Sequence, residues 1–185
     1  MERVNLQVVN PSTAGQYFHL LRRQLRRSFR KPLIVASPKK LLKNVQANSN
    51  LEDFGEGLRF KRVLTDSNPN LVAPEKVKKV ILCSGQVHLD IHSAREKAGR
   101  NDIAILRVEQ LCPFPFSSII PEIQKFKNAE VQWVQEEPAN QGPFSFVRPR
   151  LENIMRHLKR PAEISYAGRE TSGSTSTGYT VQHEA

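Results

Sequence analysis

Residues 77–108, VKKVILCSGQVHLDIHSAREKAGRNDIAILRV, contain the pattern that decides the fold. An apolar, β-branched run at 77–83 ends in a Ser-Gly turn, helical spacing follows over 87–99, and 102–108 form a second apolar run. Short apolar runs bounded by turn residues are typical of buried strands. The stretch therefore predicts two strands joined by a helix, the repeating unit of an α/β fold.

The same alternation continues toward the C-terminus. The sequence predicts a helix over 117–126, a strand over 130–135, a helix over 144–158 with an irregular start or kink at Pro149, and a short strand over 163–166. Strands that alternate with helices at this spacing indicate a largely parallel sheet. We therefore expect an α/β fold in which a layered sheet carries helices on both faces.

Another strand–helix–strand pattern precedes this region. Residues 4–9 are β-branched and partly alternating, and 33–36 form a short apolar run that predicts a buried strand. Between them, Thr13 and Gln16 match a capping box. This predicts a helix that begins near Ala14, directly after Thr13, and ends before Pro32. If the two strands are parallel, this β–α–β unit has a right-handed crossover.

The first 50 residues carry most of the excess positive charge. They hold ten basic residues and one acidic residue, whereas residues 51–185 hold 18 basic and 17 acidic residues. On the predicted helix, apolar side chains recur on one face at Phe18, Leu21, Leu25 and Phe29. Apart from Arg3, the ten basic residues form a stripe of nine: Arg22, Arg23, Arg26, Arg27, Arg30, Lys31, Lys39, Lys40 and Lys43.

This basic stripe suits an anionic ligand, nucleic-acid phosphates or an acidic partner, and a solvated helix face is an equally open interpretation. Nucleic-acid binding is disfavoured because neither a recognisable module nor interleaved aromatic residues accompany the charge. We expect no nucleic-acid partner.

Composition excludes several other classes of protein. The 185 residues are 38% apolar and 25% charged, which is enough apolar content for a core and argues against full disorder. No apolar run approaches the roughly 18 to 20 residues that span a bilayer, so we expect no membrane partner. With two cysteines the chain is no disulfide scaffold, and we expect a soluble intracellular protein with reduced thiols.

The common catalytic motifs are missing. No Walker A loop, GxGxxG, HExxH or GxSxG is present. Cys83 lies in an apolar run and is expected to be a small core residue. His88 and His92 have the spacing of a helical metal pair, but no third ligand lies near them, so we interpret both as surface histidines. We predict no catalytic, cofactor-binding or metal-binding residue in this chain.

The segment QEEPANQG at 135–142 follows an apolar strand directly. In open α/β sheets ligands gather at the carboxyl ends of strands, so its polar residues are well placed. Glu136 and Glu137 are adjacent carboxylates that are suited to orienting a cationic group. The alternative is a solvated loop in which Asn140 and Gly142 supply the turn geometry.

Several long motifs occur here in the order known from one family. Together they resemble the C-terminal part of 2-oxoglutarate dehydrogenase E1 subunits, with 2-oxoadipate dehydrogenase E1 close behind. The motifs are NLQVVNPSTAGQYFHLLRRQ, FRKPLIVASPKKLL, ILCSG, VEQLCPFPF, QEEPANQG, YAGR and TGY.

The resemblance implies a transketolase-like architecture. We expect residues 1–40 to be the end of a pyrimidine-binding domain, 41–75 a linker, 76–170 a transketolase-like C-terminal domain and 171–185 an irregular tail. Glycine-, proline- and asparagine-rich composition between about 40 and 75 independently favours a boundary there.

The resemblance also implies a reaction for the intact family enzyme. It binds thiamine diphosphate and Mg²⁺, oxidatively decarboxylates 2-oxoglutarate in the tricarboxylic acid cycle, and acts as a homodimer with E2 succinyltransferase and E3. In this family, we expect three catalytic features to lie upstream of the residues present here: the GDG motif, the catalytic histidines and the activating carboxylate. The usual final helix of the family would lie downstream of these residues. We therefore expect a fragment that stabilises the dimer and is not catalytic alone, so whether this chain counts as an enzyme stays open.

A surface for an anionic, nucleotide-like effector or a neighbouring subunit is expected along residues 22–43. The residues expected to face a ligand are Lys39, Lys40, Glu136, Glu137, Gln141 and Arg169. Gln86 stands where relatives carry lysine, which puts an anion contact there in doubt. A eukaryotic relative would lie in the mitochondrial matrix and a bacterial one in the cytoplasm. The alternatives are a 2-oxoadipate dehydrogenase fragment and a stand-alone interaction module with a basic docking helix.

Overall fold

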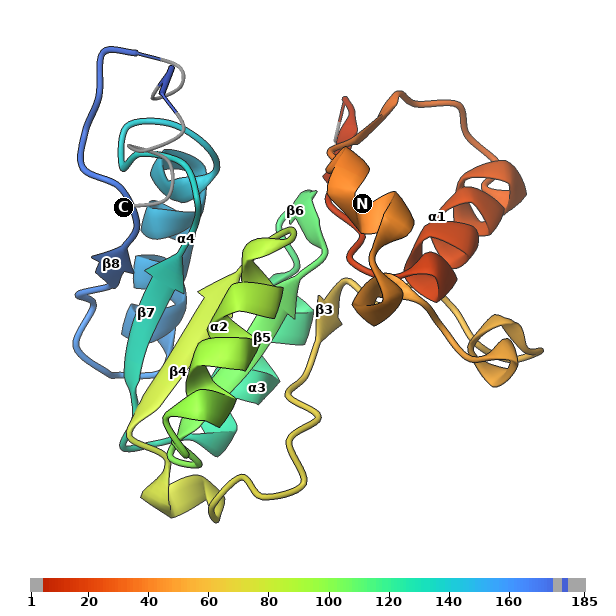
Figure 1. Ribbon diagram of the computed structural model, residues 1–185. Helices are drawn as coiled ribbons and strands as arrows, with labels where there is room; N and C mark the ends of the chain where they lie inside the picture. The colour runs from red at the N-terminus through yellow and green to blue at the C-terminus, as the bar shows by residue number, and fades with distance from the viewer. Residues whose placement is uncertain (1–4, 175–177, 180–185) are drawn as a thin grey trace.

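The computed structural model describes residues 5–174 and 178–179, which form two β-sheets and four α-helices (Figure 1). The larger sheet has five strands in the order β3-β5-β4-β7-β8. β4 is parallel to β5 and β7, β7 is parallel to β8, and only the edge strand β3 is antiparallel to its neighbour. The predicted, largely parallel sheet is therefore confirmed. Its strands are β3 Val63–Leu64, β4 Lys79–Cys83, β5 Ile103–Val108, β7 Glu130–Val134 and β8 Ser165–Ala167.

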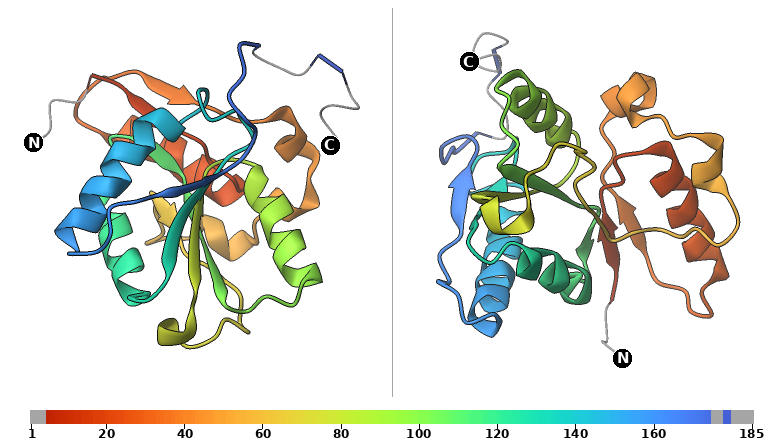
Figure 2. Two further views of the ribbon diagram at one scale, coloured as in Figure 1. Left: turned by 90° about the vertical axis from the view of Figure 1, so that its left-hand side faces the viewer. Right: turned by 90° about the horizontal axis from the view of Figure 1, so that it is seen from below.

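Helices cover both faces of this sheet, as Figure 2 shows. Side chains alternate between the faces, so Leu82 and Leu106 pack into the core formed with α3 and α4, while Cys83 and Ile105 pack with Val87 of α2. This arrangement confirms the predicted layered α/β fold. None of the helices in the described part of the chain has the length and apolarity to cross a membrane. The helices are α2 Val87–Lys97, α3 Phe116–Lys125 and α4 Phe144–His157.

The smaller sheet has three strands in the order β2-β1-β6. β1 Gln7–Val9 and β2 Leu33–Val35 are parallel and flank α1 Ala14–Arg26, so the N-terminal β–α–β unit forms as predicted. β6 Gln110–Cys112 was not predicted: it follows β5 almost at once and pairs antiparallel with β1. A three-residue strand is too short for a periodic signal. Through β6, the second half of the chain completes the sheet of the first half.

α1 differs from the prediction in its cap. Thr13 Oγ1 accepts a hydrogen bond from the Gln16 backbone nitrogen at 3.3 Å, as a capping residue does. The side chain of Gln16 does not return to Thr13, however. It bonds the backbone of Lys61, accepting from the nitrogen at 3.0 Å and donating to the oxygen at 2.6 Å. Gln16 therefore ties the helix to a segment 45 residues away.

α1 also turns its apolar face outward. Phe18 and Leu21 are 43% and 44% exposed and Leu25 is 80% exposed, whereas the buried side carries His19 and Leu20. The helix ends at Arg26, so Phe29 lies beyond it. β2 was expected to be buried, but its central residue, Ile34, is 52% exposed. The apolar spacing thus marks a face that the described residues cover only in part: the Phe18 ring lies edge-on to Phe54 at 5.5 Å, whereas Leu25 stays exposed.

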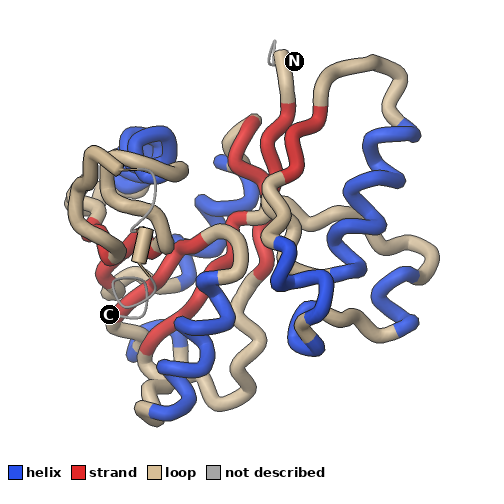
Figure 3. Tube along the Cα trace, turned by 45° about the horizontal axis from the view of Figure 1, so that its top comes forward, coloured by secondary structure: helices blue, strands red, loops and turns tan. Residues whose placement is uncertain are grey.

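The segment predicted as a linker is ordered and packs against α1 (Figure 3). His19 Nε2 donates to the Asp53 oxygen at 2.8 Å, and the Gly15 nitrogen donates to Ser49 Oγ at 2.9 Å. Phe60 is buried with residues of the smaller sheet and α1. The predicted domain limits stay a prediction, and part of the expected tail lies outside the described residues. The short helices are η1 Lys39–Lys43, η2 Val45–Ala47, η3 Leu51–Phe54 and η4 Pro74–Lys76.

Candidate functional site

The loop at 135–142 is shaped by one buried side chain, Gln135. Its Oε1 accepts hydrogen bonds from Trp133 Nε1 and from the Phe144 nitrogen, each at 3.0 Å. Its Nε2 donates to the backbone oxygens of Glu137, Pro138 and Gln141 at 3.2, 3.0 and 2.8 Å. Gln135 therefore organises the loop from inside instead of facing a ligand.

This loop packs against the segment that follows β8. Tyr166 Oη donates to the backbone oxygens of Glu137 and Arg169 at 2.9 and 3.0 Å, and Gln141 Nε2 donates to the Ser174 oxygen at 2.7 Å. These bonds place three of the predicted ligand-facing residues, Glu137, Gln141 and Arg169, on neighbouring segments. The Gln141 amide already has a backbone partner there, so its donor is committed to loop structure.

The remaining predicted residues lie on other elements. Glu136 is exposed and accepts a hydrogen bond from Gln86 Nε2 at 2.8 Å, so Gln86 connects the loop to the start of α2. Lys39 and Lys40 are exposed on η1, which follows the smaller sheet (Figure 1). The six residues thus form two separate groups on different elements, and their contact with a ligand stays a prediction.

A buried polar network joins the two sheets at the end of β5. Glu109 is 1% exposed, and its carboxylate accepts hydrogen bonds from the Ser12 nitrogen at 2.8 Å and from Ser12 Oγ. Arg107 Nη1 donates to Ser12 Oγ at 3.0 Å and to His88 Nε2 at 3.3 Å. Burial raises the pKa of Glu109, and the hydrogen bonds from Ser12 oppose that rise. The network fastens the β1–α1 loop to the larger sheet.

His88 is part of this network, and its interpretation as a surface residue is wrong. It is 4% exposed, and its Nδ1 hydrogen bonds the Gly85 oxygen at 2.8 Å. Burial is the main cause that lowers the pKa of His88 to about 4, and the positive charge of Arg107 adds to it. The ring is therefore neutral at pH 7, with Nδ1 as donor and Nε2 as acceptor.

The described residues contain no cluster of metal ligands, and Cys83 is a core residue. No three His, Cys, Asp or Glu side chains within residues 5–174 and 178–179 are grouped to hold a metal ion. Cys83 is fully buried, and burial raises its pKa to about 12. The prediction that Cys83 is a core residue is confirmed.

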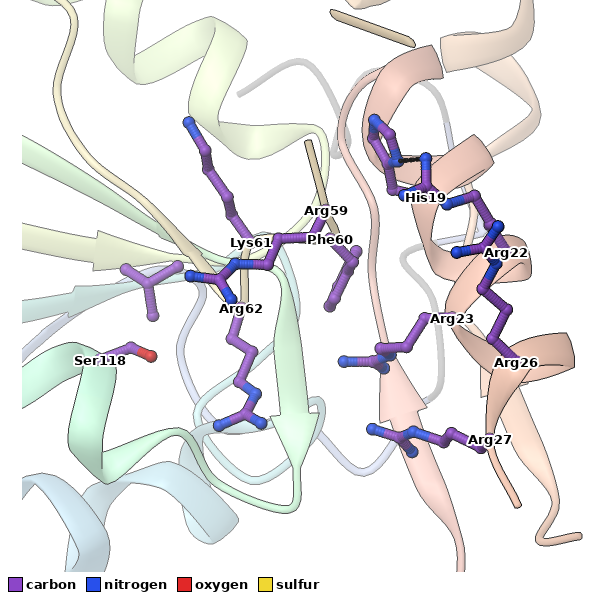
Figure 4. Close-up of a pocket in the computed structure, with 11 residues that line it drawn as sticks. His19, Arg22, Arg23, Arg26, Arg27, Arg59, Phe60, Lys61, Arg62 and Ser118 are labelled. Atoms are coloured by element: carbon purple, nitrogen blue, oxygen red, sulfur yellow. Dashed lines mark hydrogen bonds between the residues drawn. The ribbon is translucent and has the colours of Figure 1, made fainter. Parts of the chain in front are cut away.

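A cleft with a volume of about 670 Å³ lies between α1 and the segment that enters β3. We call it the basic cleft. The buried side chains of Phe60 and Val63 lie in it, and basic residues from both sides surround them (Figure 4). The lining residues are His19, Arg22, Arg23, Arg26, Arg27, Arg59, Phe60, Lys61, Arg62, Val63 and Ser118.

The sequence identified only the α1 half of the basic cleft. Arg59, Lys61 and Arg62 lie more than 30 residues further along, in a segment whose composition predicts a linker. The hydrogen bonds of Gln16 to the Lys61 backbone hold that segment against α1. These bonds, with the packing of Phe60 against Leu20 and the hydrogen bond from Arg22 Nη2 to the Leu58 oxygen at 3.1 Å, add a second basic wall to the first.

Arg23 is the most deeply held cation of the cleft. Its guanidinium donates to Gln110 Oε1 at 2.8 Å and to Gln7 Oε1 at 3.2 Å, and lies 4.4 Å from the centre of the Phe60 ring. Burial, followed by the charges of Arg27 and Arg62, lowers the pKa of Arg23 to about 10. Both acceptors are neutral amides, so the positive charge of Arg23 is oriented without being neutralised.

Comparison with known proteins identifies the relatives of this chain. Residues 48–185 match the family described as 2-oxoglutarate dehydrogenase C-terminal, and residues 4–45 match the transketolase pyrimidine-binding domain. The chain is 42% identical over 189 aligned residues to the 2-oxoglutarate dehydrogenase E1 components of Brucella anthropi, Brucella ovis and Brucella canis. These alignments cover 98% of this chain and 19% of each relative, so the chain spans about a fifth of their length.

The two matches follow one another in the same order as the two sheets of the fold, and together they cover nearly all of the described residues. They also agree with the resemblance seen in the sequence motifs. The chain belongs to the 2-oxoglutarate dehydrogenase C-terminal family.

Proposed function

We propose that this chain acts as the C-terminal region of a 2-oxoglutarate dehydrogenase E1 subunit. The parent reaction is the oxidative decarboxylation of 2-oxoglutarate with transfer of the acyl group to the lipoyl arm of E2. The observation that carries the proposal is the 42% identity to E1 components over 98% of the chain. Whether the parent acts on 2-oxoglutarate or on 2-oxoadipate depends in this proposal on the rest of the subunit.

The proposed role of this region is structural. Thiamine diphosphate supplies carbanion stabilisation when bound to such enzymes. Within residues 5–174 and 178–179, no three His, Cys, Asp or Glu side chains are grouped to hold a metal ion. Two buried ionisable groups, Glu109 and His88, belong to the network that holds the two sheets together. We therefore place the cofactor on the remainder of the subunit and assign no catalytic step to this chain.

The outward apolar face of α1 supports a role in assembly. Phe18, Leu21 and Leu25 form an exposed stripe, and burying such side chains contributes roughly 1.5–3 kcal/mol each. We propose that this stripe packs against another part of E1, in the same subunit or in a dimer partner. The further partners would be E2 and E3, in the mitochondrial matrix of a eukaryote or the cytoplasm of a bacterium.

The alternative of a stand-alone module with a basic docking helix is less well supported. Such a helix would present its arginines on an open surface. Here Arg23 of α1 and Arg27, the residue that follows α1, point into the basic cleft (Figure 4). Arg23 is also fixed by two glutamine side chains. These arginines therefore suit an internal site better than a docking surface.

A chimaera tests the proposal. The corresponding C-terminal region of the Brucella anthropi E1 component is replaced by this chain, and 2-oxoglutarate decarboxylation is assayed beside the parent enzyme. We expect activity within about tenfold of the parent, and none from the 185-residue chain alone. A chimaera that sediments like the parent but is inactive would contradict the proposal, as would turnover by the isolated chain.

A further inference from the structure

We propose that the basic cleft binds a small ligand that carries two adjacent phosphoryl groups, with Arg23, Arg27 and Arg62 as the principal contacts. Its α1 side belongs to the basic stretch at residues 22–43 for which the sequence predicts an anionic ligand, whereas the side that carries Arg62 was not identified from the sequence. The inference does not depend on the parent reaction, because it rests on the charge and geometry of the cleft alone.

The cleft concentrates positive charge without compensation. Seven of its lining residues are arginine or lysine, and none of the lining residues is acidic. Elsewhere in the described residues Arg and Lys form ion pairs, for example Arg95 with Asp66 and Arg148 with Glu152. Among residues 5–174, none of the seven basic residues of the cleft has a carboxylate within 4.0 Å. Like charges held this close repel one another, and a bound anion would relieve that repulsion.

Neutral acceptors hold two of the guanidinium groups in place. Gln7 Oε1 accepts from both Arg23 and Arg27, and Gln110 Oε1 accepts from Arg23. The glutamines are fixed in turn, because Gln110 Nε2 donates to the Pro113 oxygen and Gln7 Nε2 donates to Gln24 Oε1. Arginines oriented in advance by neutral groups lose little entropy on binding and keep their full charge for an oxyanion.

Unused donors remain in this arrangement. Arg23 Nε is buried and has no hydrogen-bond partner among the described residues. The Arg62 side chain is exposed and makes no hydrogen bond or ion pair with the described residues, yet its charge acts on both Arg23 and Arg27. Figure 4 shows Arg62 on the side of the cleft opposite these two residues. Planar guanidinium groups on both sides suit bidentate recognition of phosphate.

The size of the cleft indicates more than one phosphoryl group. Its volume of about 670 Å³ falls within the range of roughly 300–1,000 Å³ that is usual for small-molecule sites. Two arginines on one side and Arg62 on the other would each meet one end of a diphosphate.

Nucleic acid fits this cleft less well. Binding of single strands depends on aromatic rings whose faces are free to stack with bases. Phe60 is the aromatic residue of the lining other than His19, and it is 6% exposed with the Arg23 guanidinium over its ring. The cleft therefore offers charge but no accessible stacking surface.

Isothermal titration calorimetry of the 185-residue chain tests the proposal, with inorganic pyrophosphate, orthophosphate and citrate as probes. We expect saturable 1:1 binding of pyrophosphate, with orthophosphate and citrate at least tenfold weaker. Arg62→Gln should weaken pyrophosphate binding about tenfold, since its side chain has no structural hydrogen bond to lose. The matched control, Arg156→Gln on α4, removes the same charge outside the cleft and should change binding less than twofold.

Thermal unfolding provides an independent readout. Pyrophosphate should raise the Tm of the wild-type chain and of Arg156→Gln, and raise that of Arg62→Gln much less. No saturable binding at millimolar pyrophosphate would overturn the proposal, as would equal losses in the two variants. Tighter binding of polyglutamate than of pyrophosphate would also overturn it, because the cleft would then be a docking site for an acidic polypeptide. None of these binding outcomes bears on the proposed function, which is tested separately by the activity of the E1 chimaera.

Discussion

Ser12 and Glu109 are 97 residues apart in sequence and form two hydrogen bonds with each other. The pair connects the loop between β1 and α1 to the point where the chain leaves β5 for β6. Because β6 pairs with β1, the same short segment carries both a sheet contact and a buried polar contact. The junction between the two sheets is therefore an integral part of the fold.

The first prediction concerns the pH dependence that Glu109 contributes. Its pKa is raised in the folded state, so folding favours the protonated carboxyl, and stability falls as pH rises from the unfolded value of about 4.5 through the folded value. Glu109→Gln should remove this fall. Urea unfolding between pH 4.5 and 7 measures it, with the exposed Glu163→Gln as the control. Equal pH profiles for wild type and Glu109→Gln would contradict the assignment.

His88 should change the pH dependence of stability in the opposite direction from Glu109. Its folded pKa of about 4 lies below the ordinary 6.5, so its contribution is present above pH 6.5 and is lost as pH falls toward 4. The charged groups that act on it are Arg107, His92 and Asp90. We expect a loss of about 2 kcal/mol over this range, reduced from the full shift by solvent screening. His88→Gln should abolish it, whereas the exposed His157→Gln should leave the wild-type profile unchanged.

The third prediction concerns the buried ion pair between Arg95 and Asp66. Both side chains are 3% exposed, and Asp66 also accepts from the Ile105 nitrogen at 2.7 Å. Asp66→Ala leaves a buried guanidinium unpaired, which costs about 3–5 kcal/mol of unfolding free energy. Denaturant melts measure the loss. Asp102→Ala breaks the exposed pair with Arg100 and should have a far smaller effect; comparable losses would show that burial is not the cause.

Gln135 should control the order of the 135–142 loop. Gln135→Ala removes hydrogen bonds to three backbone oxygens and leaves Trp133 Nε1 without its partner, for an expected loss of about 2–3 kcal/mol. Trp133 is the single tryptophan, so its fluorescence reports the change directly, with a red shift as water enters. Gln132→Ala, three residues earlier and within β7, is the matched control. An unshifted spectrum for Gln135→Ala would count against this role.

The fifth prediction tests the exposed face of α1. Leu25 is 80% exposed, so Leu25→Ser should leave the stability of the isolated chain almost unchanged while reducing its self-association. Sedimentation velocity at several concentrations measures the effect. Leu51→Ser changes an equally exposed leucine on η3, at 85%, and should reduce association less. If both variants associate like the wild type, the stripe is not an assembly surface.

Much of the larger sheet was predictable because its signals are local. Strands such as Lys79–Cys83 are continuous apolar runs between turn residues, and the helices between them show 3.6-residue periodicity. The exposed apolar face of α1 shows the limit of that reasoning. Periodicity at Phe18, Leu21 and Leu25 identifies a face that needs a neighbour, but it does not say whether the neighbour is within the described chain.

The candidate sites were predicted less completely. Burial of His88 depends on Arg107 and the β1–α1 loop packing over it, and helical spacing alone carries no such information. Arg62 gave no signal either, because a single arginine in a polar segment resembles any surface residue. Its significance comes from facing Arg23 and Arg27 across the basic cleft.

The amino-acid sequence by itself determined the α/β alternation, the family and the concentration of positive charge near the N-terminus, since each depends on residues close together in the chain. Only the tertiary structure decided that β6 completes the first sheet, that Glu109 meets Ser12, and that two basic segments enclose one cleft. The physical reason is that these contacts form when distant segments are buried against each other. Their free energy comes from the burial of apolar surface and from hydrogen bonds between residues far apart in sequence, neither of which a local pattern encodes.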